Sequence, residues 1–99
     1  MDPFYITVNN IYKEDYKATI IFDDLGMYYY MPEANNIYRK EQLRLQQIND
    51  DYIEIVLSEN ERKGTSFMRQ DDGTIQININ FFSKANFFAL KKFLNIYFA

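Results

Sequence analysis

Apolar and polar residues alternate over residues 4–9, which predicts the first strand. Phe4, Ile6 and Val8 share one face, while Tyr5 and Thr7 share the other. Residues 17–22 repeat this alternation, with apolar side chains at 18, 20 and 22 on one face. The turn-forming residues 23–26 separate this stretch from the apolar run 27–31, so we expect a β-hairpin here.

Residues 32–48 admit two interpretations. Pro32 suits the first position of a helix, and apolar side chains recur at helical spacing as far as Ile48. In the alternative, a shorter strand is formed in which Leu43 and Leu45 alternate with polar neighbours. We favour a helix over 33–48 and keep the strand open.

In the second half of the chain, the pattern predicts strands and a terminal helix. Residues 52–57 show the clearest strand pattern, and 65–69 and 74–80 flank a turn at 70–73 whose Asp-Gly pair favours a tight hairpin. Residues 83–99 predict a helix: Ser83 can cap its amides, and Phe82 and Phe87 stand at the positions of a hydrophobic staple.

The predicted terminal helix is apolar around much of its circumference. Its apolar arc of about 220° is wider than a helix on one sheet needs. Either other elements of the chain wrap this helix, or part of it meets another chain. In the second case the candidate face for a homodimer contains Phe88, Phe93 and Tyr97.

Together these elements predict a single α+β domain over residues 1–99. We expect a mostly antiparallel sheet of five or six strands, with the helix 83–99 packed on one face. A second helix at 33–48 joins it if the helical interpretation of that stretch holds.

Composition narrows the chemistry. The chain contains no histidine and no cysteine, which excludes a Ser-His triad, a thiolate nucleophile and a Cys/His metal site. No glycine-rich phosphate loop is present. We therefore expect no enzyme, no cofactor and no metal. No apolar stretch approaches the ~20 residues of a membrane span, so we expect a cytoplasmic protein, of a bacterium or an infected host cell, without a membrane partner.

Three Asp-Asp pairs stand at predicted turns: Asp23 with Asp24, Asp50 with Asp51, and Asp71 with Asp72. Aspartate is common in turns because its side chain binds nearby backbone amides. Tracing the strands in sequence puts all three pairs at one end of the sheet, where six carboxylates would attract a basic partner. They are candidate partner-binding residues, although we favour the simpler explanation that they only shape their turns.

Tyr28 and Tyr30 are further candidates, because tyrosines on a sheet face can contact a protein or stack on bases. The simpler expectation is that two of the three tyrosines at 28–30 point into the core. The net charge of −3 disfavours nucleic acid. We expect a small acidic protein-binding module, such as a phage or mobile-element inhibitor or regulator of a nucleic-acid-processing protein. The alternatives are a single-stranded nucleic-acid-binding protein and a self-associating structural protein.

Overall fold

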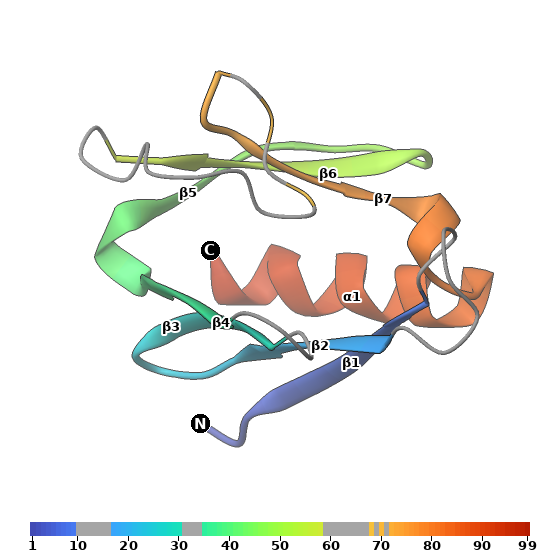
Figure 1. Ribbon diagram of the computed structural model, residues 1–99, viewed down its shortest axis with the longest axis horizontal. Coiled ribbons are helices and arrows are strands. Elements are labelled where there is room, and N and C mark those ends of the chain that lie inside the picture. The colour runs from blue at the N-terminus through green and yellow to red at the C-terminus, as the bar shows by residue number, and fades with distance from the viewer. Residues whose placement is uncertain (10–16, 31–34, 59–67, 69, 71) are drawn as a thin grey trace.

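In the computed structural model, which describes residues 1–9, 17–30, 35–58, 68, 70 and 72–99, two antiparallel sheets lie on either side of one helix (Figure 1). The predicted α+β class, with antiparallel strands and a C-terminal helix, is confirmed. The prediction of a single sheet is wrong, because the strands of the described residues divide into a four-stranded and a three-stranded sheet. The helix packs between the two sheets, yet Phe88 and Ile96 of its wide apolar arc remain exposed.

The four-stranded sheet has the order β1 (Phe4–Asn9), β2 (Lys17–Phe22), β3 (Gly26–Tyr30) and β4 (Asn35–Arg39). All neighbouring strands are antiparallel. The predicted alternation holds, so that every second side chain faces the helix. The buried side chains of this inner face are Ile6, Val8, Ala18, Ile20, Phe22, Met27, Tyr29 and Tyr38.

The β2–β3 turn requires glycine at position 26. Gly26 has a φ of +152°, in a region that favours glycine, and an added Cβ would overlap the carbonyl oxygen of Tyr38. The same Cβ would lie 2.9 Å from the Cα of Arg39. The close approach of β3 and β4 at this end of the sheet therefore depends on a missing side chain.

The described part of the 33–48 stretch is not a helix. It forms β4, a single 3-10 turn η1 (Lys40–Gln42) and β5 (Leu43–Ile48), while residues 33 and 34 lie outside the described ranges. The apparent helical spacing arose from two strands whose buried residues, Tyr38 and Leu43, stand on either side of η1. Strand pairing of Ile37 with Tyr28, and of Leu43 with Leu57, outweighed the helical preference of the local sequence.

The three-stranded sheet contains β5, β6 (Tyr52–Leu57) and β7 (Ile75–Asn78), in that order. A bulge lies between Leu45 and Gln47. The described part of the predicted 70–73 hairpin is present, since the Gln70 amide donates to the Thr74 carbonyl at 2.8 Å. Most of its first arm, 65–69, lies outside the described residues.

The predicted terminal helix is confirmed as α1 (Lys84–Tyr97), which follows a 3-10 turn η2 (Ile79–Phe81). Ser83 caps it, with Oγ accepting from the Asn86 amide at 3.1 Å. The staple is also present, because the Phe82 and Phe87 rings lie 6.2 Å apart. The helix lies between the two sheets (Figure 1) and buries Phe87, Leu90, Leu94 and Tyr97. Within the described ranges, no helix has the length and apolar content to cross a membrane.

Candidate functional site

The three Asp-Asp pairs do not share one end of the molecule, so that prediction is wrong. The turn holding Asp50 and Asp51 joins β5 to β6, beside the pairing of Tyr52 with Asn78. Ile55 pairs with Ile75, which places Asp72 at the opposite end of the same sheet. The prediction placed a strand at 65–69 between 52–57 and 74–80, which made those two segments run in the same direction. In the structure β7 pairs antiparallel with β6, so the two strands run in opposite directions and the turn before β7 lies at the other end of the sheet. Asp71 lies outside the described residues.

Two of the aspartates stabilise their own turns. Oδ1 of Asp23 accepts hydrogen bonds from the amides of Leu25 at 2.9 Å and Gly26 at 3.2 Å. Oδ1 of Asp72 accepts from the amide of Thr74 at 2.9 Å and from its hydroxyl at 2.7 Å. The amide and hydroxyl of Thr74 lower the pKa of Asp72 from its usual value. These contacts are the turn chemistry that the sequence led us to expect.

Two others form ion pairs. Oδ2 of Asp24 lies 2.8 Å from the amino group of Met1, and Oδ1 of Asp50 lies 2.9 Å from Nζ of Lys91 on α1. Hydrogen bonding to Lys91, and then its charge, lower the pKa of Asp50. Asp51 stands in the same turn, with its amide donating to Oδ1 of Asn49 at 2.8 Å. Asp24 therefore attaches the β2–β3 turn to the amino group of Met1, and Asp50 attaches the β5–β6 turn to α1.

The outer face of the four-stranded sheet carries a row of apolar side chains. Tyr5 pairs with Ile21, Ile21 with Tyr28, and Tyr28 with Ile37, so one residue from each strand contributes. We call these four residues the outer row. Its ends are solvent-exposed, at 64% for Tyr5 and 63% for Ile37, while Ile21 and Tyr28 are half-buried between their neighbours.

One of the three tyrosines at 28–30 points into the core, whereas the simpler expectation was two. Only Tyr29 points inward and is buried. Tyr28 and Tyr30 lie on the outer face, with nearly parallel rings (7°) whose centroids are 6.3 Å apart. Both tyrosines named as candidates therefore lie on an accessible surface, and Tyr28 belongs to the outer row.

A hollow adjoins the outer row at the end where β3 and β4 meet η1. It has a volume of about 420 Å³ and is lined by Asp24, Leu25, Tyr28, Ile37, Arg39 and Glu41. Leu25 is 70% exposed at its edge. The hollow thus combines apolar walls with two carboxylates and one guanidinium, and we call it the acidic hollow.

The electrostatic influence of Asp23 and Asp24 reaches three groups nearby. A hydrogen bond to Asp24, and then its charge, raise the pKa of the Met1 amino group. Burial, followed by the charge of Asp23, raises the pKa of Tyr28. Burial, and then both carboxylates, raise the pKa of Tyr97 to about 12. This end of the outer face holds the carboxylates of Asp23 and Asp24 together with two cationic groups, the Met1 amino group and the Arg39 guanidinium.

The candidate helix residues separate into two groups. Phe93 stacks on Phe4 at 4.4 Å between ring centroids, and the hydroxyl of Tyr97 donates to the carbonyl of Asp23 at 2.7 Å. Both residues belong to the interior of the chain. Phe88 is 60% exposed, and Ile96 is 78% exposed on the same helix.

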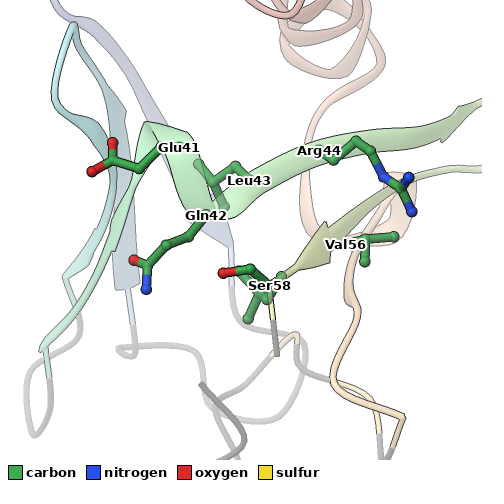
Figure 2. Close-up of a pocket in the computed structure, with 7 residues that line it drawn as sticks. Glu41, Gln42, Leu43, Arg44, Val56 and Ser58 are labelled. Carbon is green, nitrogen blue, oxygen red and sulfur yellow. The ribbon is translucent and has the colours of Figure 1, made fainter. Parts of the chain in front are cut away.

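A second hollow of about 360 Å³ lies between η1 and the ends of β5 and β6 (Figure 2). Its charged residues, Glu41 and Arg44, extend to opposite sides, with Leu43 between them, and Val56 lies beside Arg44 on the paired strand. Its polar groups therefore do not converge on a common point. In the part of the chain that the structure describes, no group of three acidic residues is placed to hold a metal ion.

The sequence interpretation missed three members of the outer row: Tyr5, Ile21 and Ile37. A signal for the first two was present, because both occupy the outward positions of strands whose inward faces were correctly predicted. Ile37 was hidden by the helical interpretation of its segment. Comparison with family models, curated proteins and solved structures finds no match to this chain.

Proposed function

We propose that the protein is a non-enzymatic protein-binding module whose contact surface is the outer row together with the acidic hollow. The observation that carries this proposal is the register, which aligns Tyr5, Ile21, Tyr28 and Ile37 across one exposed face. Clustered exposed apolar residues on a sheet face are typical of interaction sites, and tyrosine is enriched in protein interfaces. The absence of histidine and cysteine from the sequence supports the non-enzymatic part.

The chemistry of the acidic hollow favours a partner that presents a lysine or arginine within an apolar surface. Tyr28, Ile37 and Leu25 offer apolar contact for the methylene stem of such a side chain. Asp24 and Glu41 lie at the same hollow and favour its charged end. An inhibitor or regulator of a nucleic-acid-processing protein fits this description, because such proteins present basic surfaces.

A peptide titration followed by NMR tests the proposal. We expect the capped peptide acetyl-Leu-Arg-Leu-amide to shift the signals of Ile21, Tyr28 and Ile37, and to leave Gln46 and Gln76 on the other sheet unchanged. The same peptide with citrulline in place of arginine lacks the charge and should bind about tenfold more weakly, the effect of one charge-assisted hydrogen bond. Shifts confined to the three-stranded sheet, or equal affinity for both peptides, would refute the proposal.

Variants separate the surface from the fold. Asp24→Asn and Ile37→Ala should each weaken the peptide, whereas Gln76→Ala, at an outward position of β7, should not. A gel shift with oligothymidine at low salt tests the competing function. Binding that is lost in Tyr28→Ala and Tyr30→Ala would assign the outer face to single-stranded nucleic acid, because aromatic stacking on bases tolerates any sequence.

A further inference from the structure

Strand β1 forms an edge of the four-stranded sheet, and it lacks the features that usually protect an edge. Its sequence, Phe-Tyr-Ile-Thr-Val-Asn, contains no charged residue and no proline. Its pairing with β2 runs through six residues without a bulge. Natural edge strands are usually interrupted by charges, proline or bulges, because unpaired backbone groups attract another strand.

The hydrogen-bond pattern shows which groups of β1 face outward. The Asp23 amide donates to the Gly26 carbonyl at 3.0 Å, which makes residues 23 and 26 a hydrogen-bonded pair. Bonded and non-bonded pairs alternate in antiparallel sheets. Ile21 and Thr19 therefore bond to β3, and the even-numbered residues of β2 bond to β1. It follows that residues 4, 6 and 8 of β1 bond to β2, while residues 5, 7 and 9 direct their backbone groups to the open edge.

The opposite edge is different. The outward amide of Arg39 on β4 donates to Oε1 of Gln42 at 3.0 Å, so the chain itself occupies part of that edge. In the described residues, no such contact is made by the outward amides of Tyr5, Thr7 and Asn9. The two edges of this sheet therefore differ in their readiness to accept a further strand.

We propose that β1 pairs antiparallel with β1 of a second copy of this chain across a two-fold axis, so that two four-stranded sheets join into one. Residues directly opposite each other in such a pair must point to the same face. Among the registers that satisfy this condition, one uses all three outward residues of each strand. It places Thr7 opposite Thr7 of the second copy and Tyr5 opposite Asn9, which gives six backbone hydrogen bonds by the alternation rule.

A second copy fits this edge better than a charged partner. The chain has a net charge of −3, which opposes self-association except through an uncharged contact, and β1 offers one. The inner residues Ile6 and Val8 are already buried within their own copy, so the contact would be formed by the outward backbone groups and the exposed side chains of Tyr5, Thr7 and Asn9. Phe4 of β1 packs on Phe93 of α1, which holds the start of the strand against the helix. The pairing does not depend on the proposed function.

Charge exchange at position 7 tests the symmetry directly. We expect sedimentation of the wild type to give twice the 12.0 kDa mass of one chain. Thr7→Lys and Thr7→Glu should each sediment as monomers, because like charges would face each other across the axis. Mixing the two variants should restore a dimer. Thr7 is exposed, so both variants should stay folded as monomers and melt below the wild type only by the stability that dimerisation adds, while Thr7→Val should remain dimeric.

Cross-linking tests the register. The chain contains no cysteine, so Thr7→Cys introduces a single thiol, and mild oxidation should give a covalent dimer because directly paired residues lie within disulfide range. Tyr5→Cys alone should remain monomeric after denaturation, whereas its mixture with Asn9→Cys should cross-link. A monomeric wild type at the highest soluble concentration would overturn the proposal. A wild-type dimer that survives both charged variants would overturn it as well, by placing the contact elsewhere.

Discussion

The two sheets both lie against α1, but their outer faces differ in chemistry. The outward side chains of the three-stranded sheet are mostly polar or charged, and Nε2 of Gln46 donates to Oε2 of Glu54 at 2.8 Å across β5 and β6. The four-stranded sheet instead presents the outer row, whose two ends are more than half exposed. An antiparallel sheet with one face on the core normally keeps the other face polar. The three-stranded sheet follows this rule, and the four-stranded sheet departs from it.

The departure has two physical explanations. In the first, the outer row serves stability alone, because cross-strand pairs of tyrosine with isoleucine stabilise a sheet by about 0.2–1 kcal/mol each. Alternatively, its exposed ends contribute little to folding and are retained for contact with a partner. The sheets also differ in their attachment to α1, because Tyr97 bonds to the four-stranded side from the interior and Lys91 bonds to the three-stranded side at the surface.

The largest effect is expected at the glycines of the two sheets. Gly26→Ala should destabilise the protein by about 3 kcal/mol or more, because backbone strain and overlap with Tyr38 add together. Gly73, with a φ of +90°, has no atom within 4 Å of an added Cβ. Gly73→Ala should therefore cost only the left-handed backbone strain of about 1–2 kcal/mol. Urea unfolding of both variants measures this difference, and equal losses would show that β3 and β4 do not need their close approach.

Tyr97→Phe should cost about 1 kcal/mol near neutral pH, the value of one hydrogen bond. It should also change the response to alkali. The pKa of Tyr97 is about 12 in the folded protein, against 10.0 for an ordinary tyrosine. Above pH 10 the unfolded chain therefore loses this proton before the folded protein does, and stability falls as pH rises from 10 towards 12.

The measurement is the urea midpoint between pH 8 and pH 11. The wild-type midpoint should fall more steeply than that of Tyr97→Phe above pH 10. Tyr5→Phe is the matched control, since Tyr5 is exposed and the change should leave the wild-type slope intact. Parallel curves for the wild type and Tyr97→Phe would mean that the phenol is exposed to solvent, and that the attachment to Asp23 is not formed.

The outer row itself should matter little for stability. Ile37→Ala should cost less than about 1 kcal/mol, because the side chain is 63% exposed. Ile20→Ala, on the inner face of the same sheet, should cost about 2–5 kcal/mol. If thermal unfolding gave similar losses for both variants, the outer row would be a structural element, and the argument for a contact surface would lose its main support.

The strands with a buried inner face and the terminal helix could be predicted from the sequence. Burial on one side of an element produces a regular spacing of apolar residues, which is visible in the sequence itself. Ser83 with the Phe82–Phe87 staple located the start of α1 within one residue. The division at η1 could not be predicted, because pairing with strands outside the segment, β3 and β6, decided the conformation of 35–48. That pairing also determined the end at which each aspartate turn lies. Of the candidate site, the sequence identified Tyr28 and Asp24. Ile37 could not be identified, because its place beside Tyr28 follows from the pairing of β4 with β3.

The smallest effect concerns the attachment of α1 to the three-stranded sheet. Lys91 lowers the pKa of Asp50 below the ordinary 3.8, so this pair contributes stability above that pH and loses it as the pH falls through the lowered pKa. In Lys91→Met, an NMR titration should return the pKa of Asp50 to its ordinary value. Asp72 is an internal control, because Thr74 lowers its pKa and the substitution leaves that contact intact.

Asp50 is almost fully exposed, at 99% of its side chain, and solvent weakens such a pair. The melting temperature of Lys91→Met at neutral pH should therefore change much less than that of Tyr97→Phe. An unchanged pKa of Asp50 would mean that the pair does not form in solution, and that apolar packing alone holds α1 to the three-stranded sheet. In that event the contrast between the two attachments becomes sharper, because the bond from Tyr97 to Asp23 would be the remaining side-chain hydrogen bond between α1 and a sheet among the described residues.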